Sequence, residues 1–347
     1  MSTLTYAEAG FVGLLQGITE LFPISSLGHA VLIPALVGGQ WAQDLDVSRA
    51  ESPYLAYIVG LHVATAAAMI IYFWRDWLRI IKAFFASLKH FALPEPGTAR
   101  WELQGTDQKL AWMIILATIP VGIAGLALEH LFRTVFSKPV PTAAFLFANG
   151  LILLAGERAR RRSADREAQE VAADLQAVTE RQKATVAAGS QGGRRHSSGQ
   201  RALKQQHAGL AVESDRRVVR RVGWRGAFLL GASQILALLP GISRDGTVMV
   251  AGLFRGLTRQ DAARFSFLLS APVILAAGVL KIPDLTGSLG AGIHGQILFG
   301  SLVSGFAAFF SLRFLMRYFS DPKRTLTPFA IYCLAAGLGA FIYLSVR

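Results

Sequence analysis

The chain has 347 residues, of which 52% are hydrophobic, with 35 lysines and arginines against 22 acidic residues. This composition and the mean hydropathy of +0.42 exclude an ordinary soluble protein and indicate an integral membrane protein. Most of the basic residues behind the formal charge of +13 lie between apolar runs, as in the cytoplasmic loops of membrane proteins, so nucleic acid is not expected as a partner.

The first apolar segment, residues 7–38, is interrupted by a polar stretch that runs from Gln16 to His29. Pro23 and Gly28 within it interrupt helices, so we expect two half-helices that meet at a turn inside the membrane. Broken backbone at this depth is tolerated only where protein or a wet cavity satisfies it, and polar side chains there are costly. The stretch is therefore the first candidate for a functional site.

Three full spans follow in the first half, at about residues 54–74, 109–129 and 141–156. The polar loop before them, residues 39–53, contains acidic side chains and is expected outside the cell. After the first span, an amphipathic stretch with basic residues begins at Arg75 and is expected to rest on the cytoplasmic membrane surface.

A polar, basic insert at residues 158–224 divides the chain into a first membrane repeat, residues 1–157, and a second, residues 225–347. The insert has almost no aromatic residues and cannot bury enough apolar surface to fold alone. We expect it to be cytoplasmic and mostly disordered, with no more than a short helix around residues 164–187.

The second half contains another broken apolar run, interrupted at Pro240–Gly246. Full spans are predicted after it at about residues 265–282, 293–312 and 326–345. The sequence therefore predicts an all-α polytopic membrane protein with about six full transmembrane spans and two re-entrant helix pairs.

The two broken segments form an internal repeat. An offset of 218 residues pairs identical residue types, namely Gln16 with Gln234, Ile24 with Ile242, Ser25 with Ser243, and Gly28 with Gly246. Basic residues follow the second break, so it is expected to enter from the cytoplasm, whereas the first enters from outside. Similar sequence with opposite insertion predicts two inverted-topology repeats with a binding site where the breaks meet near mid-membrane.

The residue types in the breaks favour phosphate chemistry. Each break starts a half-helix whose N-terminal N–H groups attract an anion. Ser25, Ser26 and Ser243 add hydroxyl donors, and Arg244 can fork onto two phosphate oxygens, unless it only forms a structural ion pair. His29 suits a nucleophile or general acid.

Three other polar residues within the apolar segments have open roles. Glu20 suits a base, a metal ligand or a group that orients His29. His62, in the span after the first break, either lines the pocket or packs in the core. Asn149 is expected to make an interhelical hydrogen bond.

These motifs resemble the undecaprenyl-pyrophosphate phosphatase family of the bacitracin-resistance type. The family's first signature has an acidic residue or Gln one turn before a Glu, followed by Pro-x-Ser-Ser-x-Gly-His, and it is matched from Gln16 to His29. The second, Pro-Gly-x-Ser-Arg-x-Gly, is matched by Pro240–Gly246. The resemblance covers the chain apart from the insert.

The resemblance implies a hydrolase of the bacterial cytoplasmic (inner) membrane that removes the terminal phosphate of undecaprenyl diphosphate. The product is the monophosphate carrier of peptidoglycan synthesis, which links the family to cell wall biogenesis and antibiotic resistance. The active site is expected to open to the outer face. The resemblance assigns catalysis to Glu20, His29 and Ser26, substrate binding to Arg244, and a divalent cation, Mg²⁺ or Ca²⁺, to Gln16 and Glu20. Ser25, Ser243, Gly28 and Gly246 complete the expected substrate-binding site.

Two residues depart from the family pattern. Gln16 replaces the more common Glu, which removes one carboxylate from the expected metal site, and an amide oxygen is a weaker ligand. Asp245 follows Arg244 where the family usually has Ser. This carboxylate could orient Arg244, recruit the metal or weaken diphosphate binding, and the sequence does not choose among these roles.

A transporter of a lipid-linked phosphate is the alternative function, because inverted repeats with broken helices also build transporters. A base and a nucleophile at the anion site favour the enzyme. The expected partners are the polyprenyl diphosphate and membrane lipid, and a homodimer is left open. The sequence does not identify the nucleophile among His29, Ser26 and water, or the preferred isoprenoid length.

Overall fold

The structure is a computed structural model that describes residues 4–45, 53–93, 99–131, 138–186, 202–281 and 292–346. Regular structure within these ranges is entirely helical, as predicted. The helices are α1 (Tyr6–Thr19), α2 (Ser26–Val37), α3 (Gly39–Asp44), α4 (Pro53–Tyr72), α5 (Trp74–Ala92), α6 (Thr106–Leu131), α7 (Pro139–Val186), α8 (Ala202–Ser233), the 3₁₀ helix η2 (Gln234–Leu238), α9 (Arg244–Phe254), α10 (Arg259–Leu280), α12 (His294–Ser320) and α13 (Thr327–Val346).

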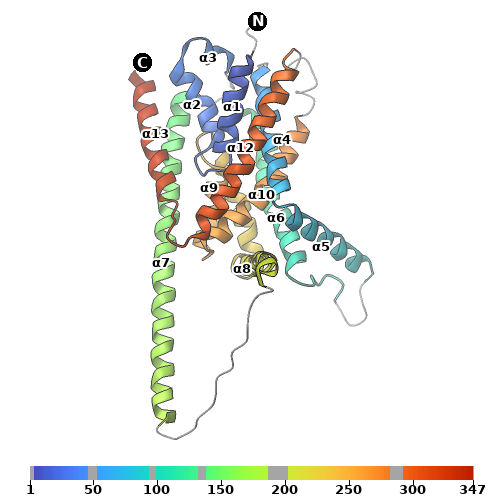
Figure 1. Cartoon of the computed structure of the whole chain (residues 1–347), viewed down its shortest axis with the longest axis vertical. Coiled ribbons are helices and arrows are strands. Elements are labelled where there is room, and N and C mark those ends of the chain that lie inside the picture. Colours follow the sequence, from blue (N-terminus) through green and yellow to red (C-terminus); the bar gives the residue numbers. More distant parts are fainter. Residues whose placement is uncertain are drawn as a thin grey trace.

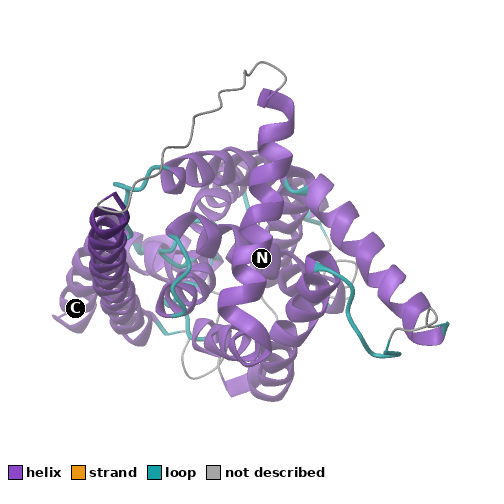
Figure 2. Cartoon of the chain, turned by 90° about the horizontal axis from the view of Figure 1, so that it is seen from below, coloured by secondary structure: helices purple, strands orange, loops and turns teal. Residues whose placement is uncertain are grey.

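Five described helices are long and apolar enough to cross a membrane, and the bent pair of α4 and α5 makes up to a sixth. The five are α6, the first part of α7, α10, α12 and α13. Helix α5 turns away from α4 by 84° and projects sideways at one end of the bundle (Figures 1 and 2). The prediction of a polytopic helical membrane protein is confirmed, and the location of α5 on the membrane surface stays a prediction.

The two broken helix pairs approach from opposite ends of the bundle (Figure 1). Helices α1 and α2 form a hairpin on the side where both chain termini lie, whereas α8 begins at the other end, near α5. This opposite approach is what an inverted-topology repeat requires, and the symmetry of the repeat itself stays a prediction.

Helix α1 packs closely against α12 through small residues. A Cβ atom added at Gly13 would lie 3.1 Å from Gly300 Cα, and one added at Gly17 would lie 2.7 Å from Ala307 Cβ. Such contacts between small residues allow helices to pack closely in a membrane, where apolar side chains gain little free energy by leaving the lipid. These contacts fix α1 and leave the neighbouring Gln16 and Glu20 buried.

Both breaks end earlier than the prolines and glycines predict. The first half-helix resumes at Ser26, so Gly28 and His29 lie in the first turn of α2. The second resumes at Arg244, after η2 has tightened the chain into a 3₁₀ turn. The reason is capping, because Ser25 and its repeat partner Ser243 both accept a hydrogen bond from the glycine N–H three residues later.

The insert contains more helix than expected. Helix α7 continues through Val186, where a short separate helix was predicted, and α8 already begins at Ala202. Residues 187–201 lie outside the described residues, as do residues 46–52 of the predicted outer loop. The composition that prevents a core, rich in Ala, Arg, Gln and Glu, still favours helix, which explains the difference.

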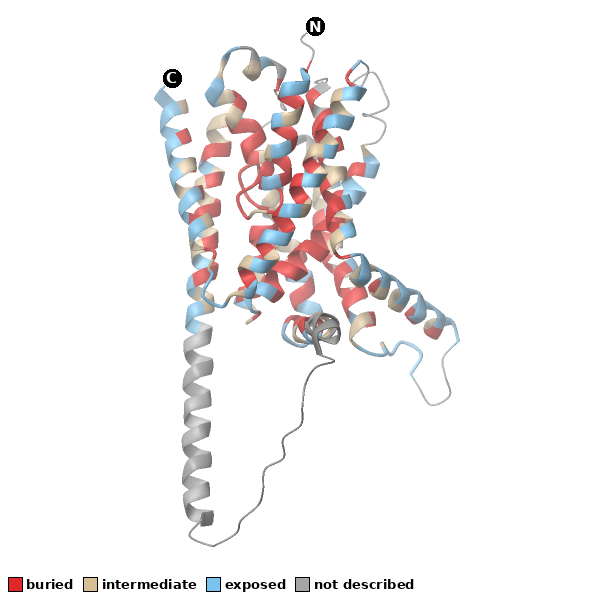
Figure 3. Ribbon diagram, viewed as in Figure 1, coloured by how far each residue is buried: buried red, intermediate tan, exposed pale blue. Residues whose placement is uncertain are grey.

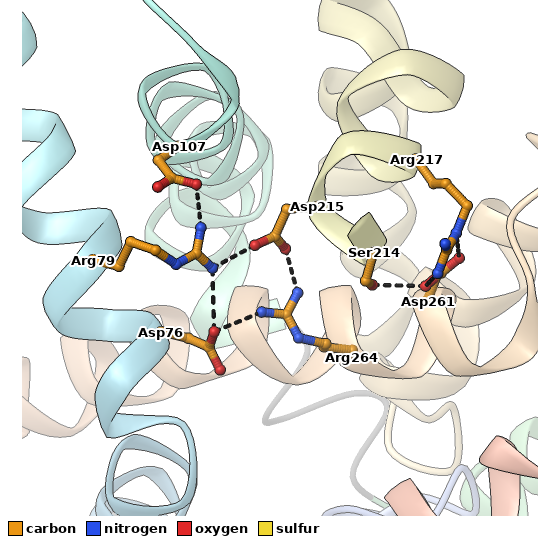
Figure 4. Close-up of polar contacts among 8 residues, drawn as sticks. All are labelled: Asp76, Arg79, Asp107, Ser214, Asp215, Arg217, Asp261 and Arg264. Carbon is orange, nitrogen blue, oxygen red and sulfur yellow. Dashed lines mark hydrogen bonds and ion pairs between the residues drawn. The ribbon is translucent and has the colours of Figure 1, made fainter. Parts of the chain in front are cut away.

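A charged network joins four helices at the end of the bundle where α5 lies (Figure 4). Arg79 of α5 bonds to Asp107 of α6 and to Asp215 of α8, and Arg264 of α10 also bonds to Asp215. Asp76 of α5 bonds to Arg264 at 2.9 Å. Burial alone would lower the pKa of the Arg79 guanidinium, but the carboxylates of Asp215 and Asp107 raise it above its usual value. The network therefore connects α5 to α8, the helix that leads into the second break.

Candidate active site

The two breaks touch each other in the buried centre of the bundle (Figure 3). Ser25 Oγ accepts hydrogen bonds from the N–H of Gly28, at 3.2 Å, and of Gly241, at 3.1 Å. A Cβ atom added at Gly28 would lie only 2.9 Å from Gly241 Cα, so a side chain at this position would separate the breaks. Gly241 also has a φ of 111°, which favours glycine. The predicted meeting of the two breaks is confirmed.

Asn149 of α7 links the same two segments. Its Nδ2 donates to the carbonyl oxygen of Pro23 in the first break at 2.9 Å, and its Oδ1 accepts from the N–H of Ser243 in the second at 3.0 Å. The side chain is fully buried. The predicted interhelical hydrogen bond is thus a bridge across the site, for which the amide supplies both the donor and the acceptor.

Glu20 lies at the end of α1 and is buried. Its Oε2 accepts hydrogen bonds from Gln16 Nε2, at 2.9 Å, and from Ser26 Oγ. The pair of Ser26 and Glu20 is the arrangement of a hydroxyl nucleophile and its base, because the carboxylate already receives the hydroxyl proton.

Arg244 reaches the first break from the second. Its Nη2 lies 3.8 Å from Glu20 Oε1, which is a loose ion pair. Its Nη1 is buried and has no hydrogen-bond acceptor among the described residues. A buried guanidinium nitrogen without an acceptor is costly, so Arg244 is suited to receive an anion beside Glu20. The structure brings Glu20 and Arg244 together, as the sequence predicts.

Asp245 belongs to the packing of α9 on α10. Its Oδ1 accepts hydrogen bonds from Ser266 Oγ and Ser270 Oγ, both at 2.6 Å. No ion pair joins Asp245 to Arg244 among the described residues. The carboxylate also interacts electrostatically with Arg244 and Glu20, so the structure does not choose among the three roles that the sequence left open. The carboxylate secures the half-helix that carries Arg244.

His29 has partners other than Glu20. Its Nδ1 lies 2.7 Å from the carbonyl oxygen of Ser25, and its Nε2 lies 2.7 Å from Tyr332 Oη of α13. The His29 and Tyr332 rings also stack, with an angle of 7° between their planes. A carbonyl oxygen only accepts, so Nδ1 carries the proton and Nε2 accepts from the tyrosine. The expected contact between Glu20 and His29 is not found among the described residues.

His62 of α4 occupies the position next to Glu20. Its Nε2 lies 3.4 Å from Glu20 Oε2, and its Nδ1 lies 2.9 Å from the carbonyl oxygen of Ile58. The sequence left His62 undecided between pocket and core. The available signal was an ionisable side chain inside an apolar span, but the face of α4 that it occupies depends on how that helix packs.

The described residues do not build a complete metal site of their own. They contain no group of three or more His, Cys, Asp or Glu side chains placed to hold an ion. Gln16 directs its Nε2, not its oxygen, toward Glu20. This donor set fits a divalent cation only where the anionic ligand supplies most of the oxygens, as Mg²⁺ sites with phosphates commonly do.

Comparisons with known proteins agree on one family. A family model described as "Bacitracin resistance protein BacA" matches residues 9–186 and 200–339. The chain is 55% identical to a Mycolicibacterium paratuberculosis protein named "Undecaprenyl-diphosphatase", with 99% of each chain covered. It is 52% identical to the "Undecaprenyl-diphosphatase 2" of Frankia alni, with 97% of each covered, and 33% identical to an "Undecaprenyl-diphosphatase" of Granulibacter bethesdensis, with 99% and 98% covered.

Proposed function

This chain belongs to the bacitracin resistance protein BacA family and is an enzyme that hydrolyses undecaprenyl diphosphate to the monophosphate and phosphate, and we propose that this reaction takes place where its two helix breaks meet. The observation that carries the assignment is the hydrogen bond from Ser26 to Glu20 beside Arg244, whose Nη1 has no hydrogen-bond partner among the described residues. It combines a nucleophile, a base and an anion-binding group at one place.

The first chemical step uses the Ser26 hydroxyl. Ser26 Oγ attacks the terminal phosphorus while Glu20 Oε2 takes the hydroxyl proton. The bridging P–O bond breaks, and its electron pair leaves with the polyprenyl monophosphate. Glu20 passes the proton that it took to the departing monophosphate and becomes a carboxylate again. In the second step water attacks the phosphoserine while Glu20 takes a proton from that water. The P–O bond to Ser26 breaks with its electron pair on Oγ, and Glu20 returns the proton to Oγ, which releases phosphate and restores the hydroxyl.

Arg244 and the two half-helix N-termini hold the phosphates in this scheme. Each N-cap serine occupies one of the N–H groups of its first turn, at Gly28 and Gly246, and the others remain for a ligand. Charge builds up on the phosphate oxygens in the transition state, so these donors stabilise it more than the ground state. Ser25 and Ser243 serve the substrate indirectly, by shaping the two termini.

His29 supports the site instead of attacking phosphorus. Both of its ring nitrogens are hydrogen bonded, to Ser25 and to Tyr332, which would have to be broken before the ring could react. The bond to the Ser25 carbonyl steadies a residue with a φ of 69°, in the left-handed region that costs energy outside glycine. His29 thereby keeps Ser25 and the neighbouring Ser26 in place.

A divalent cation in this site would be held by Glu20 and, after a turn of its amide, by Gln16. When bound, it would supply charge neutralisation for the diphosphate oxygens. The single carboxylate supports an ion that arrives with the substrate over one that resides in the protein. Its identity, Mg²⁺ or Ca²⁺, stays a prediction.

The membrane location has a finer form that we also propose. Basic residues gather at the end of the bundle that carries α5 and the insert, which supports a cytoplasmic location for that end and an outer location for the termini. The first break, with Glu20 and Ser26, enters from the outer end, so the pocket would open to the outer face of the inner membrane. The homodimer and the membrane lipid partner stay predictions.

The test is phosphate release by the purified protein from farnesyl or undecaprenyl diphosphate. We expect Ser26→Ala, Glu20→Gln and Arg244→Ala each to lower kcat by a factor of about 100 or more, as removal of a nucleophile, base or charge stabiliser does elsewhere. Vesicles that flip the lipid without releasing phosphate would instead support the carrier. Unchanged turnover in all three variants would overturn the assignment of the site.

A further inference from the structure

We propose that His62 of α4 is a positioning residue that holds the Glu20 carboxylate against Ser26. This inference rests on the proposed function, in which Glu20 takes the proton of the Ser26 hydroxyl. It adds α4 to the site, because Glu20 and Ser26 belong to the first break and Arg244 to the second, whereas His62 lies on the long helix that follows the first break.

The imidazole ring is fixed by its own helix. Nδ1 lies 2.9 Å from the carbonyl oxygen of Ile58, one turn earlier, and therefore carries the proton of that hydrogen bond. This bond directs Nε2 toward Glu20 Oε2, 3.4 Å away. The ring cannot turn away without breaking the bond to Ile58.

Helix α4 is itself tied to the helix that carries Glu20. Tyr57, five residues before His62, is fully buried, and its hydroxyl donates to the carbonyl oxygen of Ala9 on α1. The position of His62 relative to α1 is thus set by a second, separate contact. This gives α4 the rigidity that a group needs when it orients a flexible glutamate side chain.

Glu20 needs such a group because of its place in the chain. It is the C-cap of α1, directly before the turn, so the helix constrains it on one side only. Its two oxygens face different partners, with Arg244 near Oε1 and Gln16, Ser26 and His62 near Oε2. Without His62, the attraction to Arg244 would compete with Ser26 for the carboxylate. A base oriented by a third group is the general pattern of activated hydroxyl nucleophiles.

The experiment compares His62→Ala and His62→Gln in phosphate release from farnesyl diphosphate. We expect His62→Ala to lower kcat about tenfold or more and to change KM less than about threefold, because substrate binding by Arg244 remains. His62→Gln supplies an N–H donor at a similar reach and should recover kcat to within about threefold of the wild type. The control is His90→Ala, which removes another buried histidine, on α5, that contacts a backbone carbonyl, and it should keep wild-type turnover.

A double-mutant cycle tests whether His62 acts through Glu20. Glu20→Asp shortens the side chain and draws the carboxylate away from His62. In this background, His62→Ala should therefore lower kcat by less than about threefold. Three outcomes would each overturn the proposal. They are a double mutant whose loss in kcat equals the product of the two single losses, equal losses of kcat in His62→Ala and His62→Gln, and an effect of His62→Ala on KM alone. These outcomes are distinct from a failure of the proposed function, in which the wild type itself releases no phosphate or Ser26→Ala and Glu20→Gln retain full turnover.

Discussion

Ser25 and Gly241, 216 residues apart, share a hydrogen bond of 3.1 Å from the Gly241 N–H to the Ser25 hydroxyl oxygen. The same oxygen caps α2 through Gly28, so one side chain both starts a half-helix and holds the opposite break against it. The site is therefore assembled by the contact between the breaks, and its stability should respond to changes at this contact.

Substitution of Ser25 should cost more stability than substitution of its repeat partner. Ser25→Ala removes the cap of Gly28 and the acceptor for Gly241, whereas Ser243→Ala removes only the cap of Gly246. We expect Ser25→Ala to lower the free energy of unfolding by about 1 kcal/mol more than Ser243→Ala does. Thermal unfolding in detergent measures both, and equal losses would show that the crossing bond contributes nothing.

Asn149→Asp should separate the breaks with little change in side-chain volume. One carboxylate oxygen would then face the carbonyl oxygen of Pro23, where Asn149 now donates, while the other could still accept from Ser243. Because both sites are buried, we expect a loss of about 1–3 kcal/mol in unfolding free energy and reduced kcat. Asn149→Leu should be similarly destabilising, because it leaves the Ser243 N–H unpaired. A fully active, equally stable Asn149→Asp protein would contradict the bridging role.

Local patterns in the sequence were sufficient for the spans, the two breaks and the pairing of Glu20 with Arg244. Short motifs with proline and glycine indicate the breaks, and the offset of 218 residues that pairs Ser25 with Ser243 already identifies the two N-cap residues as equivalent. Opposite insertion of two similar motifs then brings their polar residues to the same depth. These inferences need chain order and residue type, but no detail of helix rotation.

The roles of the two histidines could not be read in the same way. Whether His29 faces Glu20 or Tyr332, and whether His62 lines the pocket or packs in the core, depends on the rotation of α2 and α4 about their axes. That rotation is set by contacts between distant segments, such as the bond from Tyr57 to Ala9. The packing of Asp245 could not be predicted for the same reason, since its partners Ser266 and Ser270 lie about two and three turns into α10.

Gln16→Glu should strengthen the response to divalent cations. The new carboxylate would stand one helical turn before Glu20 and add a hard oxygen ligand beside it. We expect the Mg²⁺ concentration for half-maximal phosphate release to fall about tenfold. A Gln43→Glu control adds the same charge on exposed α3 and should leave the titration unchanged. An identical Mg²⁺ curve for Gln16→Glu would argue against a cation at this position.

The orientation of the bundle can be measured with single cysteines. The natural Cys333 is buried, so a membrane-impermeant thiol reagent should label the wild-type protein weakly. We expect Gln43→Cys on α3 to be labelled in intact cells, and Lys89→Cys on α5 to be labelled only after the membrane is opened. The reverse pattern would place the first break, with Ser26, on the cytoplasmic side and contradict the proposed outward opening.

Asp215→Asn should be among the most destabilising single changes outside the site. The carboxylate of Asp215 is almost completely buried and bonds to both Arg79 and Arg264, so its removal would leave two guanidinium groups with less compensation in a poorly solvated place (Figure 4). Breaking a buried ion pair by removing one partner costs about 3–5 kcal/mol.

The matched control is Asp321→Asn, whose pair with Arg324 is exposed and should contribute less than about 1 kcal/mol. Unfolding in detergent compares the two variants. Because the network anchors α8, which leads into the second break, Asp215→Asn should also lower turnover. A loss no larger than that of Asp321→Asn would mean that solvent already screens the network.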